Sequence, residues 1–254
     1  MPYNFQNTGI IILAAGRGKR LGCVDIPKVM CELNGRPIIS YILEVLENGG
    51  VDKNKISIVV GFQKGKIMEK FSGYIYAPQE ELLGTAHAAL TGARKLQDGL
   101  ENFLVINGDD SAFYTFETLN DFVGRHLKNK NDITLLTCEK ENPEGLGRII
   151  RNDYCQVIAV REKENLTAVE ENIKEVSTGT YCFRREWFRE IYPALKPIAN
   201  LGEYGLPAFV EEALKIGAKF EAVKLENPDE WFGINTREQL KMAEALKKKE
   251  NYES

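Results

Sequence analysis

Short, strongly apolar runs alternate with amphipathic segments along most of the chain, and this alternation constrains the fold more than any other feature. Residues 9–13 (GIIIL), 56–60 (ISIVV) and 103–106 (FLVI) have the length and composition of strands buried on both faces. Residues 37–46 (PIISYILEVL) predict a helix with proline in its first turn. Strands and helices alternating in this way predict an α/β fold with parallel strands.

The rest of the chain continues the pattern, with more strand structure in its second half. Residues 148–160 predict a hairpin that turns at Asn152 and Asp153. No repeat or linker divides the 254 residues, so we expect one domain. Further strands are expected at 74–76, 133–137, 176–183 and 220–225, and further helices at 64–70, 85–96, 116–127, 203–216 and 236–248.

Composition argues against several classes of protein. Lys plus Arg is 33 and Asp plus Glu is 37, so a net charge of −4 gives no general attraction to nucleic acid or anionic lipid. No apolar run reaches the roughly 18 residues of a membrane helix, and no basic segment precedes the first apolar run as in a secretory signal. We therefore expect a cytoplasmic protein without nucleic-acid or membrane partners.

Five cysteines, an odd number with no CxxC spacing, argue against a disulfide framework or a zinc ribbon. Free thiols in a reducing compartment are the simpler expectation. The only two histidines, His87 and His126, argue against a metal site built from several imidazoles. The cysteines are Cys23, Cys31, Cys138, Cys155 and Cys182.

A glycine-containing basic segment follows the first predicted strand: residues 13–20 (LAAGRGKR), then Pro27 and Lys28. Small residues there let the backbone approach a ligand, and N–H groups with Arg20 and Lys28 suit phosphate oxygens. The spacing matches neither a Walker A loop nor GxGxxG. The alternative is a glycine turn with basic residues on the surface.

Residues 79–88 (QEELLGTAHA) form the second segment of interest. The Gln79 amide can pair with a base edge through one donor and one acceptor, and Gly84 with Thr85 can begin a helix under the base or ribose. The alternative is a helix start capped by Thr85. We expect His87 to pack within the helix rather than to bind a ligand.

The third segment, residues 105–110 (VINGDD), places carboxylates directly after a buried strand. In open α/β sheets ligands bind at the carboxyl ends of strands, where Asp109 would suit Mg²⁺ that carries phosphates. A second oxygen ligand is needed, and Asn235 in residues 231–236 (WFGINT) is a candidate. The alternatives are an acidic turn and an asparagine that caps the last helix.

Together these segments resemble the sugar-1-phosphate nucleotidyltransferases, most closely the uridylyltransferase domain of bacterial N-acetylglucosamine-1-phosphate uridylyltransferase. The resemblance covers about residues 9–245 and rests on LAAGxGxR with PK, QxxxLGTAHA, NGD, GLGRI, STG and GIN, in the family's order. It implies a three-layer, doubly wound, mostly parallel mixed sheet of the Rossmann-like type. Residues 1–130 would form a nucleotide-binding half and 131–254 a sugar-binding half, without a β-helix acyltransferase domain.

The resemblance also implies roles for individual residues. Arg20, Lys28 and Asp109 would be catalytic, and Asp109 with Asn235 would bind Mg²⁺. The nucleotide would contact Leu13, Ala14, Ala15, Gly16, Gly18, Arg20, Lys28, Gln79, Gly84 and Thr85. The sugar would contact Asn107, Gly108, Gly147, Glu162, Ser177 and Thr178.

The implied reaction is Mg²⁺-dependent transfer of a nucleotidyl group, expected to be UMP from UTP, to a sugar-1-phosphate, with release of pyrophosphate. N-acetylglucosamine-1-phosphate and glucose-1-phosphate are the expected acceptors. Asn107, Ser177 and the pair Asp110-Ser111 differ from the residues usual in that relative. The changes at Asn107 and Ser177 bear on the sugar more than on the reaction, and those after Asp109 and at Ser177 motivate a regulatory alternative. The alternatives are the same fold acting with CTP or on a non-sugar phosphate, and a catalytically weak regulatory homologue.

Overall fold

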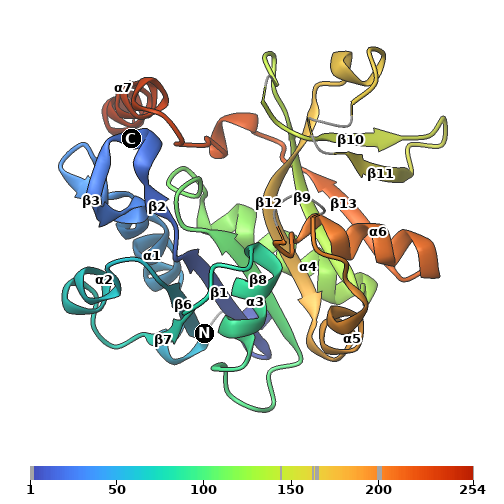
Figure 1. The fold of residues 1–254 in the computed structure, drawn as a ribbon, viewed down its shortest axis with the longest axis horizontal. Helices are drawn as coiled ribbons and strands as arrows, with labels where there is room; N and C mark the ends of the chain where they lie inside the picture. Colours follow the sequence, from blue (N-terminus) through green and yellow to red (C-terminus); the bar gives the residue numbers. More distant parts are fainter. Residues whose placement is uncertain (1–2, 144, 162, 164–165, 199–201, 254) are drawn as a thin grey trace.

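A seven-stranded sheet in the order β13-β9-β12-β8-β1-β6-β7 forms the centre of the protein (Figure 1). The computed structural model describes residues 3–143, 145–161, 163, 166–198 and 202–253. Only β12 runs antiparallel to its neighbours β8 and β9, whereas the other pairs in the sheet are parallel. The strands are β1 (Thr8–Ala14), β6 (Ile56–Val60), β7 (Ile75–Pro78), β8 (Asn102–Asn107), β9 (Ile133–Glu139), β12 (Glu175–Arg184) and β13 (Phe220–Lys224). The predicted α/β fold with a mostly parallel mixed sheet is confirmed.

Helices cover both faces of this sheet, which makes three layers (Figure 1). Ile10 and Ile12 of β1 pack in one core with α1 and α4, while Ile11 and Leu13 pack in the other with α3, α5 and α6. This alternation follows from the two-residue period of a strand. The helices are α1 (Ile38–Asn48), α2 (Lys64–Lys70), α3 (Thr85–Ala93), α4 (Phe116–Asn129), α5 (Arg185–Ile191), α6 (Pro207–Ile216) and α7 (Arg237–Glu253). Among the described residues, no helix has both the length and the apolar composition needed to cross a membrane.

In the described residues, three two-stranded hairpins stand apart from the central sheet, and one of them carries the predicted turn. β10 (Arg148–Arg151) and β11 (Val157–Arg161) pair antiparallel around Asn152 and Asp153, as expected. The pairs β2 (Arg17–Gly18) with β3 (Cys23–Pro27) and β4 (Glu32–Leu33) with β5 (Arg36–Pro37) were not predicted. β2, β4 and β5 are too short to show periodicity, and β3 lacks the buried apolar run of the other strands. Pro37 therefore ends β5 and precedes α1 instead of lying in its first turn.

The last helix packs back onto these early hairpins. A third core cluster joins Leu21 and Leu33 to Ile234 and Ala243, so α7 covers the segment that follows β1. In Figure 1 the red α7 accordingly lies beside the blue β3. Segments more than 200 residues apart in sequence thus meet at one end of the sheet.

The expectation of five free thiols is wrong for one pair. Cys23 and Cys31 form a disulfide, while Cys138, Cys155 and Cys182 are free. The β2–β3 hairpin folds Cys23 over Gly18, where an added Cβ would lie 3.4 Å from the Cys31 sulfur. Tertiary folding rather than a recognisable spacing brings these two sulfurs together.

We predict that His126 makes the stability of the protein depend on pH. The ring is buried between α4, β8 and β9, with Nδ1 2.8 Å from the Thr134 hydroxyl and Nε2 3.2 Å from the Asn102 side-chain oxygen. Burial lowers the pKa of His126 from 6.5 to about 4. Below pH 6.5 the unfolded chain therefore binds a proton that the native chain does not.

The native state should consequently lose about 3 kcal/mol of unfolding free energy as the pH falls from 6.5 to 4. Urea unfolding at both pH values measures this loss. His126→Gln should remove it, because a glutamine amide does not gain a proton, whereas His87→Gln should keep it. Equal losses in the wild type and His126→Gln would contradict the argument.

Candidate active site

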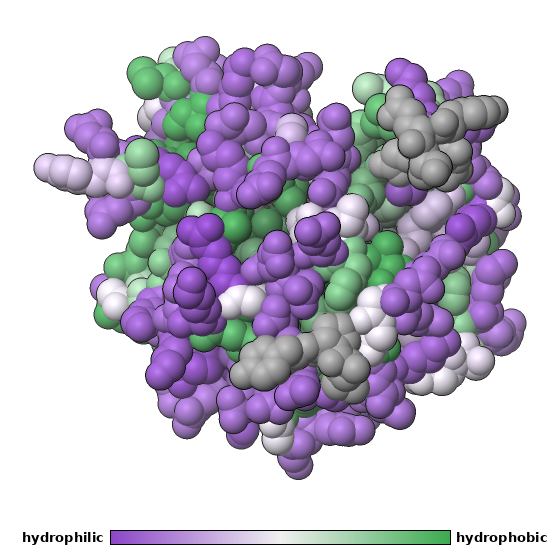
Figure 2. Space-filling model, turned by 180° about the vertical axis from the view of Figure 1, so that it is seen from behind, coloured by the Kyte–Doolittle hydropathy of each residue, from purple (hydrophilic) through white to green (hydrophobic). Residues whose placement is uncertain are grey.

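The carboxyl ends of β1 and β8 meet at the upper edge of the sheet in Figure 1. The Gly108 N–H donates to the Leu13 carbonyl at 3.0 Å, which holds the two post-strand segments together. This edge lies between α7 and the β10–β11 hairpin, and the molecule is indented there when seen from behind (Figure 2). Such an edge is the usual ligand-binding position of an open α/β sheet.

Three of the predicted site residues meet at this edge. The Lys28 ammonium contacts the Asp109 carboxylate and donates to Asn235 Oδ1 at 2.7 Å. The Lys28 N–H also donates to the Gly16 carbonyl at 3.1 Å, so the lysine is tied to the segment that follows β1. The side chains of Lys28 and Asp109 are only 15% and 22% exposed, so bulk water screens their charges little.

We refer to Lys28, Asp109 and Asn235 together as the Lys28 cluster. The start of α7 places Asn235 in it. Thr236 Oγ1 accepts from the Gln239 N–H at 3.2 Å, and Gln239 Oε1 accepts from the N–H groups of Thr236 at 3.0 Å and of Asn235 at 2.8 Å. This is a capping box with Thr236 as the cap. The alternative in which Asn235 caps the helix is therefore wrong, and its side chain instead binds Lys28.

The oxygens of Asp109 and Asn235 suit a magnesium ion. They come from distant parts of the chain and already converge on one positive group, the Lys28 ammonium. Mg²⁺ commonly takes one or two protein oxygens and completes its shell with water and substrate phosphates. The described residues include no group of three or more Asp, Glu, His or Cys side chains that could hold a metal ion.

The predicted phosphate-binding segment runs from buried to exposed. Leu13, Ala14 and Ala15 are buried at the end of β1, whereas Gly16 and Arg20 are exposed. An added Cβ at Gly16 would have no described atom within 4 Å, so packing does not require glycine there. A ligand that approaches the backbone closely would explain it. No hydrogen bond or ion pair within the described ranges joins Arg20 to the Lys28 cluster.

Gln79 is buried rather than displayed at the surface. Its Nε2 donates to the Gly84 carbonyl at 3.2 Å and lies 3.0 Å from His87 Nδ1. These contacts fix the loop before α3, and His87 lies half-buried on that helix. The recognition of a base edge by Gln79 stays a prediction.

Gly84 and Thr85 begin α3 in a different way from the capped start considered above. Gly84 is the N-cap residue, and no side chain caps the helix. Thr85 Oγ1 instead accepts from the Leu206 N–H at 3.0 Å, and the Ala86 N–H donates to the Tyr204 carbonyl at 2.8 Å. The idea that Thr85 caps the helix is therefore wrong, and the residue ties α3 to the segment before α6.

A cavity of about 250 Å³ lies beside the Lys28 cluster, and most of the residues predicted to contact the sugar line it. It is bordered by segments from both halves of the chain. Six of its lining residues were predicted as site residues: Thr85, Asn107, Gly147, Ser177, Thr178 and Asn235. Gly108 is buried between β1 and β8, and Glu162 lies outside the described residues.

Sequence reasoning gave no site role to Asp110 or Trp231, whose side chains also line this cavity. Both stand within the segments that contain Asp109 and Asn235, so their positions in the chain were the available signal. Burial raises the pKa of Asp110 well above its usual range, and the negative charge of Asp109 adds to this effect. Lys28 and a hydrogen bond from Asn107 act in the opposite direction.

Comparison with known proteins identifies the family of this site. The family model described as nucleotidyl transferase matches residues 10–247. The chain belongs to the nucleotidyl transferase family. This confirms, at the level of the family, the resemblance inferred from the motifs.

Curated relatives of this nucleotidyl transferase include bifunctional GlmU proteins. The GlmU of Carboxydothermus hydrogenoformans is 37% identical over 231 residues, which cover 91% of this chain and 50% of the relative. The GlmU of Desulfotalea psychrophila is 32% identical over 250 residues, or 96% of this chain and 72% of the relative. The chain thus spans about half the length of the first of these relatives.

A solved structure supports the fold of the nucleotidyl transferase. A crystal structure described as a putative glucose-1-phosphate thymidylyltransferase from Bacillus anthracis, in complex with a sucrose, matches with a TM-score of 0.78. The two chains share 22% sequence identity, and the match covers 94% of each. At this identity the likeness concerns the fold.

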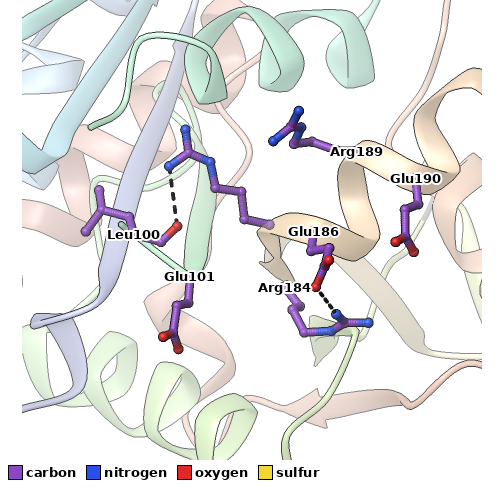
Figure 3. A pocket seen from close by; sticks show the side chains of 7 residues that line it. Leu100, Glu101, Arg184, Glu186, Arg189 and Glu190 are labelled. Atoms are coloured by element: carbon purple, nitrogen blue, oxygen red, sulfur yellow. Dashed lines mark hydrogen bonds and ion pairs between the residues drawn. The ribbon is translucent and has the colours of Figure 1, made fainter. Parts of the chain in front are cut away.

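A larger cavity of about 780 Å³ lies at the opposite edge of the nucleotidyl transferase sheet, where β8 begins and β12 ends (Figure 3). Two of its arginines, Arg184 and Arg185, are engaged in structural contacts. Arg184 pairs with Asp132 at 2.6 Å and with Glu186 at 3.3 Å, and Arg185 donates to carbonyls after α3, including that of Gln97 at 2.6 Å. The larger volume of this cavity is therefore no reason to regard it as the active site.

We predict that Gly84→Ala destabilises the nucleotidyl transferase. Gly84 has φ +95°, and an added Cβ would lie 2.5 Å from the Tyr204 carbonyl oxygen and 2.8 Å from its nitrogen. Both the strain and the clash involve backbone, so we expect a loss of about 1–3 kcal/mol in unfolding free energy. Denaturant titration measures it.

The matched control for that substitution is Gly65→Ala, at the second residue of α2. An added Cβ there meets only the Glu69 side chain at 3.7 Å, and alanine favours a helix by about 0.5–1 kcal/mol over glycine. The two glycine substitutions should therefore shift stability in opposite directions. A Gly84→Ala variant as stable as the wild type would contradict the close approach of the Tyr204 backbone to Gly84.

Proposed function

We propose that this chain catalyses Mg²⁺-dependent transfer of UMP from UTP to a sugar-1-phosphate, with release of pyrophosphate. The observation that carries the proposal is the convergence of Lys28, Asp109 and Asn235 beside a cavity of about 250 Å³. The expected acceptors are N-acetylglucosamine-1-phosphate and glucose-1-phosphate. The names of the relatives support this class, since one is a putative glucose-1-phosphate thymidylyltransferase and others are bifunctional GlmU proteins.

No nucleophilic side chain is needed for this reaction. A sugar-1-phosphate is already an anion at neutral pH, and its phosphate oxygen attacks the α-phosphate of the nucleotide. The barrier lies in bringing the anions together and in stabilising charge on the reacting phosphoryl group. An arrangement of cations and backbone N–H groups around a small cavity meets these needs.

Individual residues then have separate tasks in the proposed reaction. The backbone from Leu13 to Gly18, with Arg20, holds the triphosphate, and Lys28 neutralises charge near the α-phosphate. Asp109 and Asn235 would hold Mg²⁺, which supplies further positive charge to the reacting phosphates. Gln79, Gly84 and Thr85 border the pyrimidine in this proposal.

Pyrophosphate release tests the proposed function. UTP, CTP, dTTP, ATP and GTP are each combined, with Mg²⁺, with glucose-, N-acetylglucosamine-, glucosamine- and galactose-1-phosphate. Phosphocholine serves as a non-sugar acceptor in a further set. We expect release with UTP and one of the sugar phosphates, and none after chelation of the metal.

Other results of this panel would point elsewhere. Release with CTP alone or with phosphocholine alone would favour the other nucleotide or a non-sugar acceptor on the same fold. A folded protein that binds UTP but releases no pyrophosphate from any pair would favour the regulatory alternative. The latter result would contradict the proposed reaction.

A further inference from the structure

The cavity beside the Lys28 cluster contains a carboxylate whose hydrogen bonding is half complete. Asp110 Oδ2 accepts from Asn107 Nδ2 at 3.2 Å. Asp110 Oδ1 is buried and has no hydrogen-bond partner among the described residues. A buried acceptor without a partner is unfavourable, and a ligand in the cavity that donates a hydrogen bond to it would remove this cost.

The surroundings hold this carboxylate at the cavity. An added Cβ at Gly179 would lie 2.3 Å from Asn107 Nδ2, so only glycine lets the Asn107 amide lie here. Asn107 in turn binds Oδ2 and leaves Oδ1 as the unpaired oxygen. Asn107, Asp110 and Gly179 all line the cavity.

A second unpaired group borders the same cavity and has the opposite polarity. Trp231 is 5% exposed, and its Nε1–H donor is buried without a partner in the described part of the chain. The cavity thus offers one free acceptor and one free donor. Hydroxyl groups satisfy both kinds of atom, whereas an ammonium group satisfies only the acceptor.

We propose that Asp110 determines which acceptor this nucleotidyl transferase uses, because its Oδ1 forms a hydrogen bond with a hydroxyl of the sugar-1-phosphate. The inference rests on the proposed function and deepens it by naming a residue that selects the sugar. Among the described residues that line the cavity, Asp110 is the one with a carboxyl group, whereas Asp109 contacts Lys28 nearby. A sugar that lacks the matching hydroxyl leaves Oδ1 buried and unpaired, and is rejected.

The test couples one residue to one hydroxyl. The wild type and Asp110→Asn are assayed with the sugar-1-phosphate that performs best in the panel above and with its single-deoxy analogues. We expect Asp110→Asn to raise the KM for the sugar phosphate about 10- to 100-fold and to leave the KM for UTP within about twofold. One deoxy analogue should be poor with the wild type but no worse than the parent sugar with the variant.

Two further variants keep the test independent of folding. Asp110→Ser removes the buried carboxylate and should give the same loss of discrimination in a folded protein. Asp121→Asn changes an exposed carboxylate on α4 and should leave every parameter unchanged. Affinity for Mn²⁺ without sugar phosphate should not change in any of the three variants.

Several outcomes would overturn this assignment. An unchanged KM for the sugar phosphate, or an unchanged profile over the deoxy analogues, contradicts a contact between Asp110 and the sugar. A tenfold loss of Mn²⁺ affinity in Asp110→Asn would make Asp110 a metal ligand instead. If the wild type prefers glucosamine-1-phosphate and Asp110→Asn loses that preference, Asp110 contacts the ammonium group of the sugar instead of a hydroxyl. If the wild type uses no sugar phosphate at all, the proposed function fails as well.

Discussion

Replacing Asp109 by alanine is expected to lower kcat for pyrophosphate release at least about 100-fold. Asp109 is the one carboxylate in the Lys28 cluster, and with Asn235 it forms the oxygen pair that suits Mg²⁺. Its loss leaves a single neutral amide oxygen for the metal. We therefore expect weaker binding of Mn²⁺, used as a spectroscopic substitute for Mg²⁺, together with the loss of turnover.

Asp121→Ala is the matched control for this substitution, because it removes an exposed carboxylate from α4. Its kcat and Mn²⁺ affinity should stay within about twofold of the wild type. Thermal unfolding of both variants shows whether each is folded. Normal turnover by a folded Asp109→Ala protein would remove Asp109 from the proposed chemistry.

Replacing Lys28 by alanine is expected to lower kcat by a similar factor, at least about 100-fold, but with a different effect on the metal. The Lys28 ammonium contacts both Asp109 and Asn235, so without substrate it occupies the position of a cation. Its removal frees both oxygens. Mn²⁺ affinity should therefore rise in Lys28→Ala, whereas it should fall in Asp109→Ala.

The opposite changes in Mn²⁺ affinity distinguish a lysine that acts on the substrate from an aspartate that binds the metal. Lys64→Ala is the control, because Lys64 also pairs with a carboxylate, Glu80 at 2.8 Å, but lies exposed on α2. It should change neither turnover nor metal affinity. If Lys28→Ala bound Mn²⁺ more weakly than the wild type, the lysine would support the metal site instead of competing for it.

Long, periodic elements of the fold were predictable from sequence. The strand β6 and the helix α2 begin and end as expected, and β1, β8, α4 and α7 differ by a few residues at their ends. α5 and the β2–β3 and β4–β5 hairpins after β1 were missed; β2, β4 and β5 have only two residues each, too few to show periodicity. Their conformations depend on what packs against them, such as α7 over Leu21 and Leu33.

Some features of the candidate site were likewise predictable from sequence, and others were not. Residue type and position after a strand indicated Lys28, Asp109 and Asn235, and the structure brings their side chains together. Local sequence could not exclude a capping role for Asn235, because Asn and Thr both cap helices and only the hydrogen bonds to Gln239 select Thr236. The spacing of the cysteines likewise did not predict the Cys23–Cys31 disulfide.

Local patterns along the chain were enough to predict the class of the fold, the order of its main elements and the motifs that indicate phosphate and metal chemistry. Each of these follows from the nature of residues close together along the chain. The tertiary structure alone decided that Asn235 meets Lys28, that Asp110 keeps an unpaired oxygen at the cavity, and that two cysteines are bonded. These features depend on segments far apart in sequence, whose distances are fixed only when the sheet and its helices pack together.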